Sequence, residues 1–152
     1  MSYIVSYRKH IDNLRTVELA LPEDAETHQR IGTELATIDG VTYVALPDGA
    51  VLPDPQPVEI AASVSTAAVD PAIKETIKAV SPHCLLINDR MQAMIRENYP
   101  LEDELKYARI GVGAAMGIYT PTQEEVNQMT VFGEFVESVR QWGRDERAKI
   151  GL

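Results

Sequence analysis

The chain has 152 residues, of which 45% are hydrophobic and 24% are charged, fractions close to those of ordinary globular proteins. They exclude wholesale disorder, and a chain of this length can bury a substantial core without disulfides or metals. The formal net charge of -9 repels phosphate, and no run approaches the ~18 apolar residues of a membrane span. We therefore expect neither a nucleic-acid partner nor a membrane.

The sequence contains one cysteine, Cys84, which excludes an internal disulfide and a cysteine-rich zinc site. The first ten residues lack the apolar region of a secretory signal peptide. Both observations predict that the protein is made and retained in the cytoplasm, or is released only by lysis. No motif predicts a cofactor.

Residues 1–46 carry strand patterns. Residues 3–7 are β-branched and aromatic, and residues 17–21 alternate apolar and other side chains, so we expect two early strands. The pair Asp39-Gly40 separates two further apolar runs and predicts a type I′ β-hairpin. Residues 23–30 are polar, and both a loop and a short helix stay open.

Residues 47–68 form a connector rich in proline and small residues, and we expect it to be extended. It divides the chain into three parts, which are a β-rich unit over 1–46, the connector over 47–68 and a helical region over 69–152. A sheet as small as that of residues 1–46 needs a covering surface from its own helices or from another chain.

Helix starts are marked at two places after the connector. Asp70-Pro71 and Ser81-Pro82 each place a capping oxygen before a proline, which fits the first helical position because its missing N–H costs nothing there. Two helices therefore begin at these pairs.

Two more helices are predicted further along. One runs from Leu101 to near Gly117, and the last opens at Thr120-Pro121 with Gln123 at the capping-box position. Apolar residues of the first of these recur at helical spacing, at Leu101, Leu105, Ala108, Val112 and Ala115. The whole chain is thus predicted to be α+β, with a small N-terminal antiparallel β unit, a proline-rich connector and a C-terminal region of three to four helices.

Candidate chemical groups are few. His83 and Cys84 are adjacent on a predicted helix, so their side chains diverge, and burial of the thiol is the favoured interpretation. The sequence Gly111-Val-Gly113 follows a helical stretch instead of a strand, so it does not predict a dinucleotide site. An acidic loop offers oxygen and nitrogen donors without the spacing of a known metal site, at Glu23, Asp24, Glu26 and His28. We expect a protein that is not an enzyme and has no metal site; a small cytosolic enzyme that uses Cys84 or this loop is an alternative.

The last helix carries more apolar side chains than one buried stripe needs. Core packing and an interface with another chain are equally compatible with this excess. The interface hypothesis names Phe132, Phe135, Val139 and Trp142 for helix contacts, and Val51, Leu52, Pro53 and Pro55 for an arm that lies along a partner. A homo-oligomer is expected on this basis.

Three stretches in order along the chain carry a family resemblance, at Ile38–Gly49, Ile95–Leu105 and Phe135–Arg140. With the proline-rich joint, they make residues 38–152 resemble small tail-associated proteins of tailed bacteriophages. The resemblance implies a structural virion protein of a tail or tail fibre that binds other virion or tail proteins. It also implies an alternative, a fibre-assembly chaperone that is absent from the mature particle.

Overall fold

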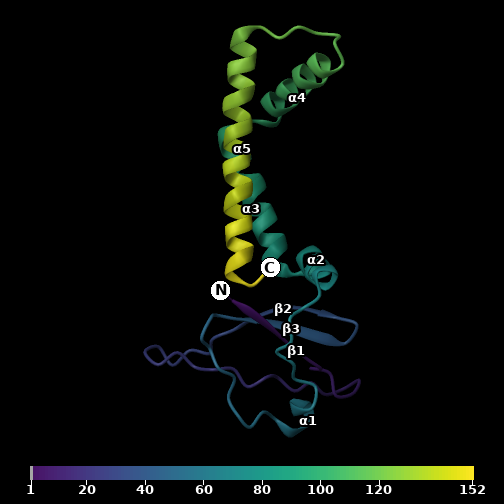
Figure 1. The fold of residues 1–152 in the computed structure, drawn as a ribbon, viewed down its shortest axis with the longest axis vertical. Helices are drawn as coiled ribbons and strands as arrows, with labels where there is room; N and C mark the ends of the chain where they lie inside the picture. The colour runs from purple at the N-terminus through teal and green to yellow at the C-terminus, as the bar shows by residue number, and fades with distance from the viewer. Residues whose placement is uncertain (1) are drawn as a thin grey trace. The chain divides into compact units, whose positions relative to one another are not determined.

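The computed structural model describes residues 2–152 and shows a three-stranded sheet followed by five helices, which confirms the α+β class (Figure 1). The strands form one antiparallel sheet in the order β1-β3-β2. Their bounds are Tyr3–Tyr7 for β1, Thr33–Ile38 for β2 and Val41–Leu46 for β3. The helices are α1 (Val58–Ala61), α2 (Pro71–Val80), α3 (Pro82–Asn98), α4 (Leu101–Ala115) and α5 (Gln123–Lys149).

The chain divides into two compact units. The first, here the sheet unit, comprises Met1–Leu86 and Glu146–Leu152, and the second, here the helical unit, comprises Ile87–Asp145. The division predicted from the sequence, into residues 1–46, 47–68 and 69–152, differs from these two units and stays a prediction.

The hairpin between β2 and β3 turns at Asp39 and Gly40, as predicted. Both residues have positive φ angles, 50° and 78°, and Ile38 pairs with Val41 across the turn. A type I′ turn needs positive φ at both central positions because this twist matches that of the two strands.

Replacing Gly40 with Ala is expected to lower the free energy of unfolding by about 1 kcal/mol, because a Cβ disfavours positive φ. Gly40→Asn is the matched control and should lose less, since asparagine tolerates this conformation. Urea denaturation of both variants measures the difference. Equal losses would contradict the turn type.

The second early strand predicted at residues 17–21 is wrong. This segment lies outside the sheet, although Leu19 is buried in the core. The amide of Gln56 replaces a ladder partner: the Ala20 N–H donates to Gln56 Oε1 at 2.9 Å, and Gln56 Nε2 donates to the Ala20 carbonyl at 3.1 Å. A side chain 36 residues away thus satisfies the backbone that a neighbouring strand would otherwise satisfy.

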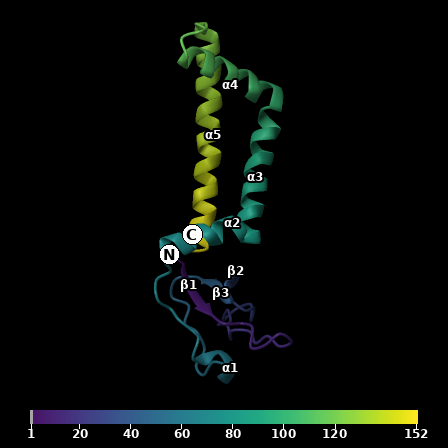
Figure 2. The same cartoon turned by 90° about the vertical axis from the view of Figure 1, so that its right-hand side faces the viewer.

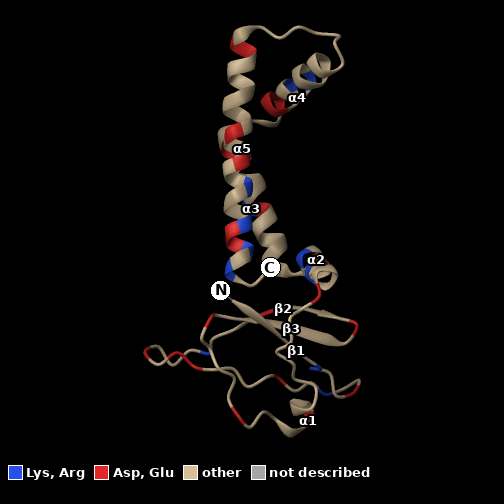
Figure 3. Ribbon diagram, in the orientation of Figure 1, with Lys and Arg blue, Asp and Glu red and all other residues tan. Residues whose placement is uncertain are grey.

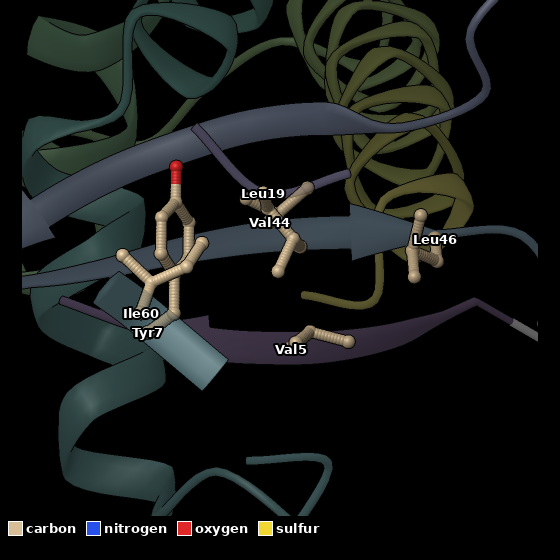
Figure 4. Packing of buried hydrophobic residues seen from close by; sticks show 6 residues of the cluster. All are labelled: Val5, Tyr7, Leu19, Val44, Leu46 and Ile60. Carbon is tan, nitrogen blue, oxygen red and sulfur yellow. The ribbon is translucent and has the colours of Figure 1, made fainter. Parts of the chain in front are cut away.

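One face of the sheet is covered by α1 and by the 17–21 segment (Figure 4). Ile60 of α1 and Leu19 pack there against the side chains of Val5, Tyr7, Val44 and Leu46. The connector therefore contains a short helix that is anchored in the core, and it also bonds to the sheet unit through the Ser6–Ser65 bridge.

The opposite face is covered by α2 and the C-terminal residues. Ile77 is fully buried here and packs in one cluster with Ile4, Leu35, Tyr43 and Ala45. Four partly buried apolar side chains complete this cover, from Val69, Ile73, Ile150 and Leu152. Helices and terminal segments of the same unit thus supply the cover that the small sheet needs.

Both α2 and α3 begin at the predicted prolines, but only the predicted cap of α2 forms, since Ser81 Oγ accepts no N–H of α3. Asp70 accepts a hydrogen bond from the Ala72 N–H at 2.7 Å and precedes Pro71 at the first position of α2. In the helical unit, α4 ends at Ala115 with Met116 as its C-cap, and Gly117 follows with a φ of 70°. Figure 2 shows α4 crossing from the end of α3 towards the beginning of α5.

The capping box of α5 lies two residues later than predicted. Thr122 Oγ1 accepts from the Glu125 N–H at 3.2 Å, and a Glu125 carboxylate oxygen accepts from the Thr122 N–H at 2.8 Å. The Thr122 N–H and the Tyr119 hydroxyl both donate to this carboxylate and lower the pKa of Glu125. Thr122 caps α5 in place of Thr120 because the Glu125 side chain, three residues later, accepts a hydrogen bond from the Thr122 N–H.

Candidate interaction surface of the helical unit

Four aromatic rings from α4, α5 and the turn before α4 form one cluster in the helical unit. The ring of Tyr99 lies 4.9 Å from that of Phe132 and 5.5 Å from that of Phe135. The ring of Tyr107 lies 5.2 Å from that of Phe132. Edge and tilted ring pairs at these distances stabilise beyond the area they bury, so this cluster holds α4 and α5 together.

A hollow of about 250 Å³ opens beside this ring cluster. It is lined by Tyr99, Tyr107, Asn127, Gln128 and Val131. Its wall combines aromatic rings with two amides and has no ionisable group other than the phenols. These groups can hold an apolar or aromatic side chain of a partner, and they lack an acid, a base or a nucleophile for catalysis at neutral pH.

Helix α4 has two apolar faces. The inward face is partly buried and includes Tyr107, Ile110 and Ala114. The opposite face carries the apolar stripe recognised in the sequence, here the outer stripe, which consists of Leu101, Leu105, Ala108, Val112 and Ala115. All five members of the outer stripe are exposed, and α4 contains no buried residue.

The exposure of large side chains on the outer stripe is high. Leu101 is 54% exposed, Leu105 43% and Val112 58%. Further exposed apolar residues follow the stripe along the chain, at Met116, Ile118, Val126 and Val131. Neighbouring apolar side chains of this kind mark an interaction site on a folded protein.

The helical unit has little core of its own. Among its residues only Ile87, Val139 and Gly143 are buried. Gly143 lets α3 and α5 approach closely, since a Cβ there would lie 2.3 Å from the Met91 sulfur. A unit of this size with so few buried residues gains stability when another surface covers it.

The four residues proposed for helix contacts lie on α5 in different surroundings. Phe132 and Phe135 are partly buried in the ring cluster, and Val139 is only 1% exposed. Trp142 is partly buried. Much of their apolar surface is therefore used inside the chain, and a contact with another chain stays a prediction for them.

The residues proposed for the arm also differ in how far they are buried. Leu52 packs against the sheet core, whereas Val51, Pro53 and Pro55 are exposed. The Pro53 carbonyl accepts a hydrogen bond from Gln56 Nε2 at 2.7 Å, which closes a local turn. Whether Val51 and the two prolines contact a partner stays a prediction.

Cys84 is fully buried, while His83 beside it is exposed. Burial raises the pKa of the Cys84 thiol, and the positive charge of Arg147 offsets only part of that rise. A neutral, inaccessible thiol is a poor nucleophile.

We expect Cys84 of the folded protein to resist alkylation by iodoacetamide near neutral pH and to react once urea unfolds the chain. Labelling rises again only as the pH approaches the raised pKa or the fold opens. Mass spectrometry of the labelled peptide measures this difference. Rapid labelling of the native protein would instead support the alternative of an enzyme that uses Cys84 as a nucleophile.

The acidic loop uses its carboxylate for its own turn. Asp24 Oδ1 accepts from the N–H groups of Glu26 and Thr27 at 3.0 and 2.7 Å. These bonds, led by that from the Thr27 N–H, lower the pKa of Asp24. Across residues 2–152 the structure has no group of three or more His, Cys, Asp or Glu side chains placed to hold a metal ion.

The basic residues near the end of α5 pair with glutamates of the same helix (Figure 3). Glu137 contacts both Arg140 and Arg144, and Lys149 contacts Glu146. This mixed charge is typical of a solvated helix face.

Searches of protein-family models, curated proteins and solved structures yield no match to this chain. Among the helices of residues 2–152, none combines the length and apolar character needed to cross a bilayer. The surface of the helical unit is therefore the feature on which a function can be argued.

Proposed function

We propose that the protein is a non-enzymatic structural adaptor of a phage tail or tail-fibre assembly. It acts through packing of helices between chains. The observation that carries this proposal is the exposed apolar surface of α4 and of the start of α5, which has no cover within the helical unit. Exposed apolar surface destabilises a free chain in water, and burying the same surface stabilises an assembly.

The chemistry of the site agrees with a binding role. The hollow beside the ring cluster has an aromatic and amide lining, and Cys84 is buried with a raised pKa. Aromatic side chains in such hollows are common anchors of protein interfaces. The exposed Val51, Pro53 and Pro55 offer a second contact on the sheet unit.

The phage context comes from the sequence resemblance over residues 38–152. In this proposal the protein is made in the host cytoplasm and then joins the tail through other virion proteins. No cofactor takes part.

Quantitative mass spectrometry of gradient-purified particles from the producing virus tests the proposal. The adaptor predicts a fixed number of copies per particle that survives a high-salt wash, because the contact is apolar. A chain that is abundant in infected cells and absent from particles would establish the fibre-assembly chaperone in its place. If the protein instead belongs to a cell and never associates with virus particles, both the adaptor and the chaperone are contradicted.

A further inference from the structure

We propose that the outer stripe of α4 is covered by the outer stripe of a second copy of the chain, with the two helices antiparallel. This inference deepens the proposed function, because it names the partner of one surface of the adaptor.

The spacing of the outer stripe is that of a coiled-coil seam. Its members follow one another at intervals of four, three, four and three residues. This pattern keeps apolar side chains on one line facing a partner helix. The inward face of α4 already meets the helical unit through Tyr107, so α4 lies between two packing surfaces.

Leu101 and Leu105, the larger side chains of the outer stripe, come before the smaller Ala108 and Val112, so an antiparallel copy sets large side chains opposite small ones. With Leu105 opposite Ala108 of the second copy, Leu101 lies opposite Val112 of the second copy. Each layer occurs twice, as a two-fold axis requires. Each layer also pairs a leucine with a smaller residue, which allows the helices to approach closely.

The charges beside the stripe are self-complementary in the same arrangement. Glu102 and Arg109 are exposed, lie seven residues apart and occupy the same flank. Figure 3 shows the acidic start of α4 and the basic residues further along it. In the antiparallel pair, Glu102 of each copy faces Arg109 of the other, and these pairs set the orientation.

Glu102 and Arg109 are available to form ion pairs with a partner chain. No ion pair within residues 2–152 involves Glu102 or Arg109. A parallel pair would instead place Arg109 against Glu104, but Glu104 already accepts from Arg96 at 2.9 Å. The available charges therefore favour the antiparallel pair.

Sedimentation equilibrium of the full chain from micromolar to millimolar concentration tests this pairing. We expect a monomer–dimer equilibrium in the wild-type protein. Val112→Glu should weaken dimerisation at least about tenfold, because it places a charge in the seam. Val58→Glu is the matched control: Val58 is 85% exposed, lies in α1 of the sheet unit and should leave the equilibrium unchanged.

The orientation has its own test. Glu102→Arg and Arg109→Glu should each weaken the dimer, and the double variant should restore it, because the opposite charges face each other again. Circular dichroism checks that helix content is kept in every variant.

A wild-type monomer at every concentration would overturn the pairing. So would a Val112→Glu dimer as tight as the wild type, or a control that weakens it equally. Loss in all charge variants without restoration would overturn the antiparallel register. None of these outcomes removes the chain from purified particles, so failure of this inference is distinguishable from failure of the adaptor.

Discussion

Replacing Ile77 with Ala is expected to lower the free energy of unfolding of the sheet unit by about 3 kcal/mol. Ile77 is fully buried where α2 covers the sheet, beside Ile4, Leu35 and Tyr43. Truncation to alanine removes apolar contacts and leaves a cavity, since the strands on the other side are fixed by their hydrogen bonds. Urea denaturation followed by circular dichroism measures the loss.

Ile77→Val is the matched control and should cost about 1 kcal/mol, because it removes a single methyl group. Val80→Ala is a second control on the same helix, and its exposed side chain should have little effect. An Ile77→Ala protein as stable as the Val80→Ala protein would mean that α2 does not cover the sheet.

Replacing Tyr99 with Ala is expected to destabilise the helical unit by about 2–3 kcal/mol. The ring of Tyr99 contacts three other aromatic rings, from Tyr107, Phe132 and Phe135. The unit has few buried residues to compensate, so we expect α4 to detach from α5 before the sheet unit unfolds. Hydrogen exchange of the α4 and α5 amides measures this local opening.

Tyr99→Phe keeps the ring and should leave exchange in α4 nearly unchanged. Phe135→Leu tests the same cluster from α5 and should fall between the two variants, because an aliphatic side chain keeps part of the contact area. Unchanged exchange in Tyr99→Ala would show that Phe132 and Phe135 are not held by rings of their own chain.

The features predicted correctly from the sequence are local ones. Asp39-Gly40 determines a hairpin because its own backbone angles select the turn, and Asp70 caps α2 through a bond to a residue two positions away. The α+β class follows from the order of such elements.

The features that the sequence did not reveal depend on residues far apart. The 17–21 segment alternates like a strand, but the amide of Gln56 satisfies its backbone. For α5, the apolar excess did not show that rings of Tyr99 and Tyr107 cover part of it.

The orientation of α4 could not be read from the periodicity of its sequence. The outer stripe has the spacing of a core-facing helix, yet the structure leaves Leu101 and Val112 exposed. The missing signal was the second apolar line through Tyr107, Ile110 and Ala114, which shows that this helix has two faces to bury. A helix with two apolar faces indicates contacts on both sides.

The central claim is that the helical unit carries apolar surface which a second copy of the chain covers. Static light scattering of the purified full chain over a dilution series tests it most directly. We expect a mass near twice the 16.8 kDa of the monomer at high concentration, falling towards 16.8 kDa on dilution. A mass of 16.8 kDa at every concentration would contradict the claim.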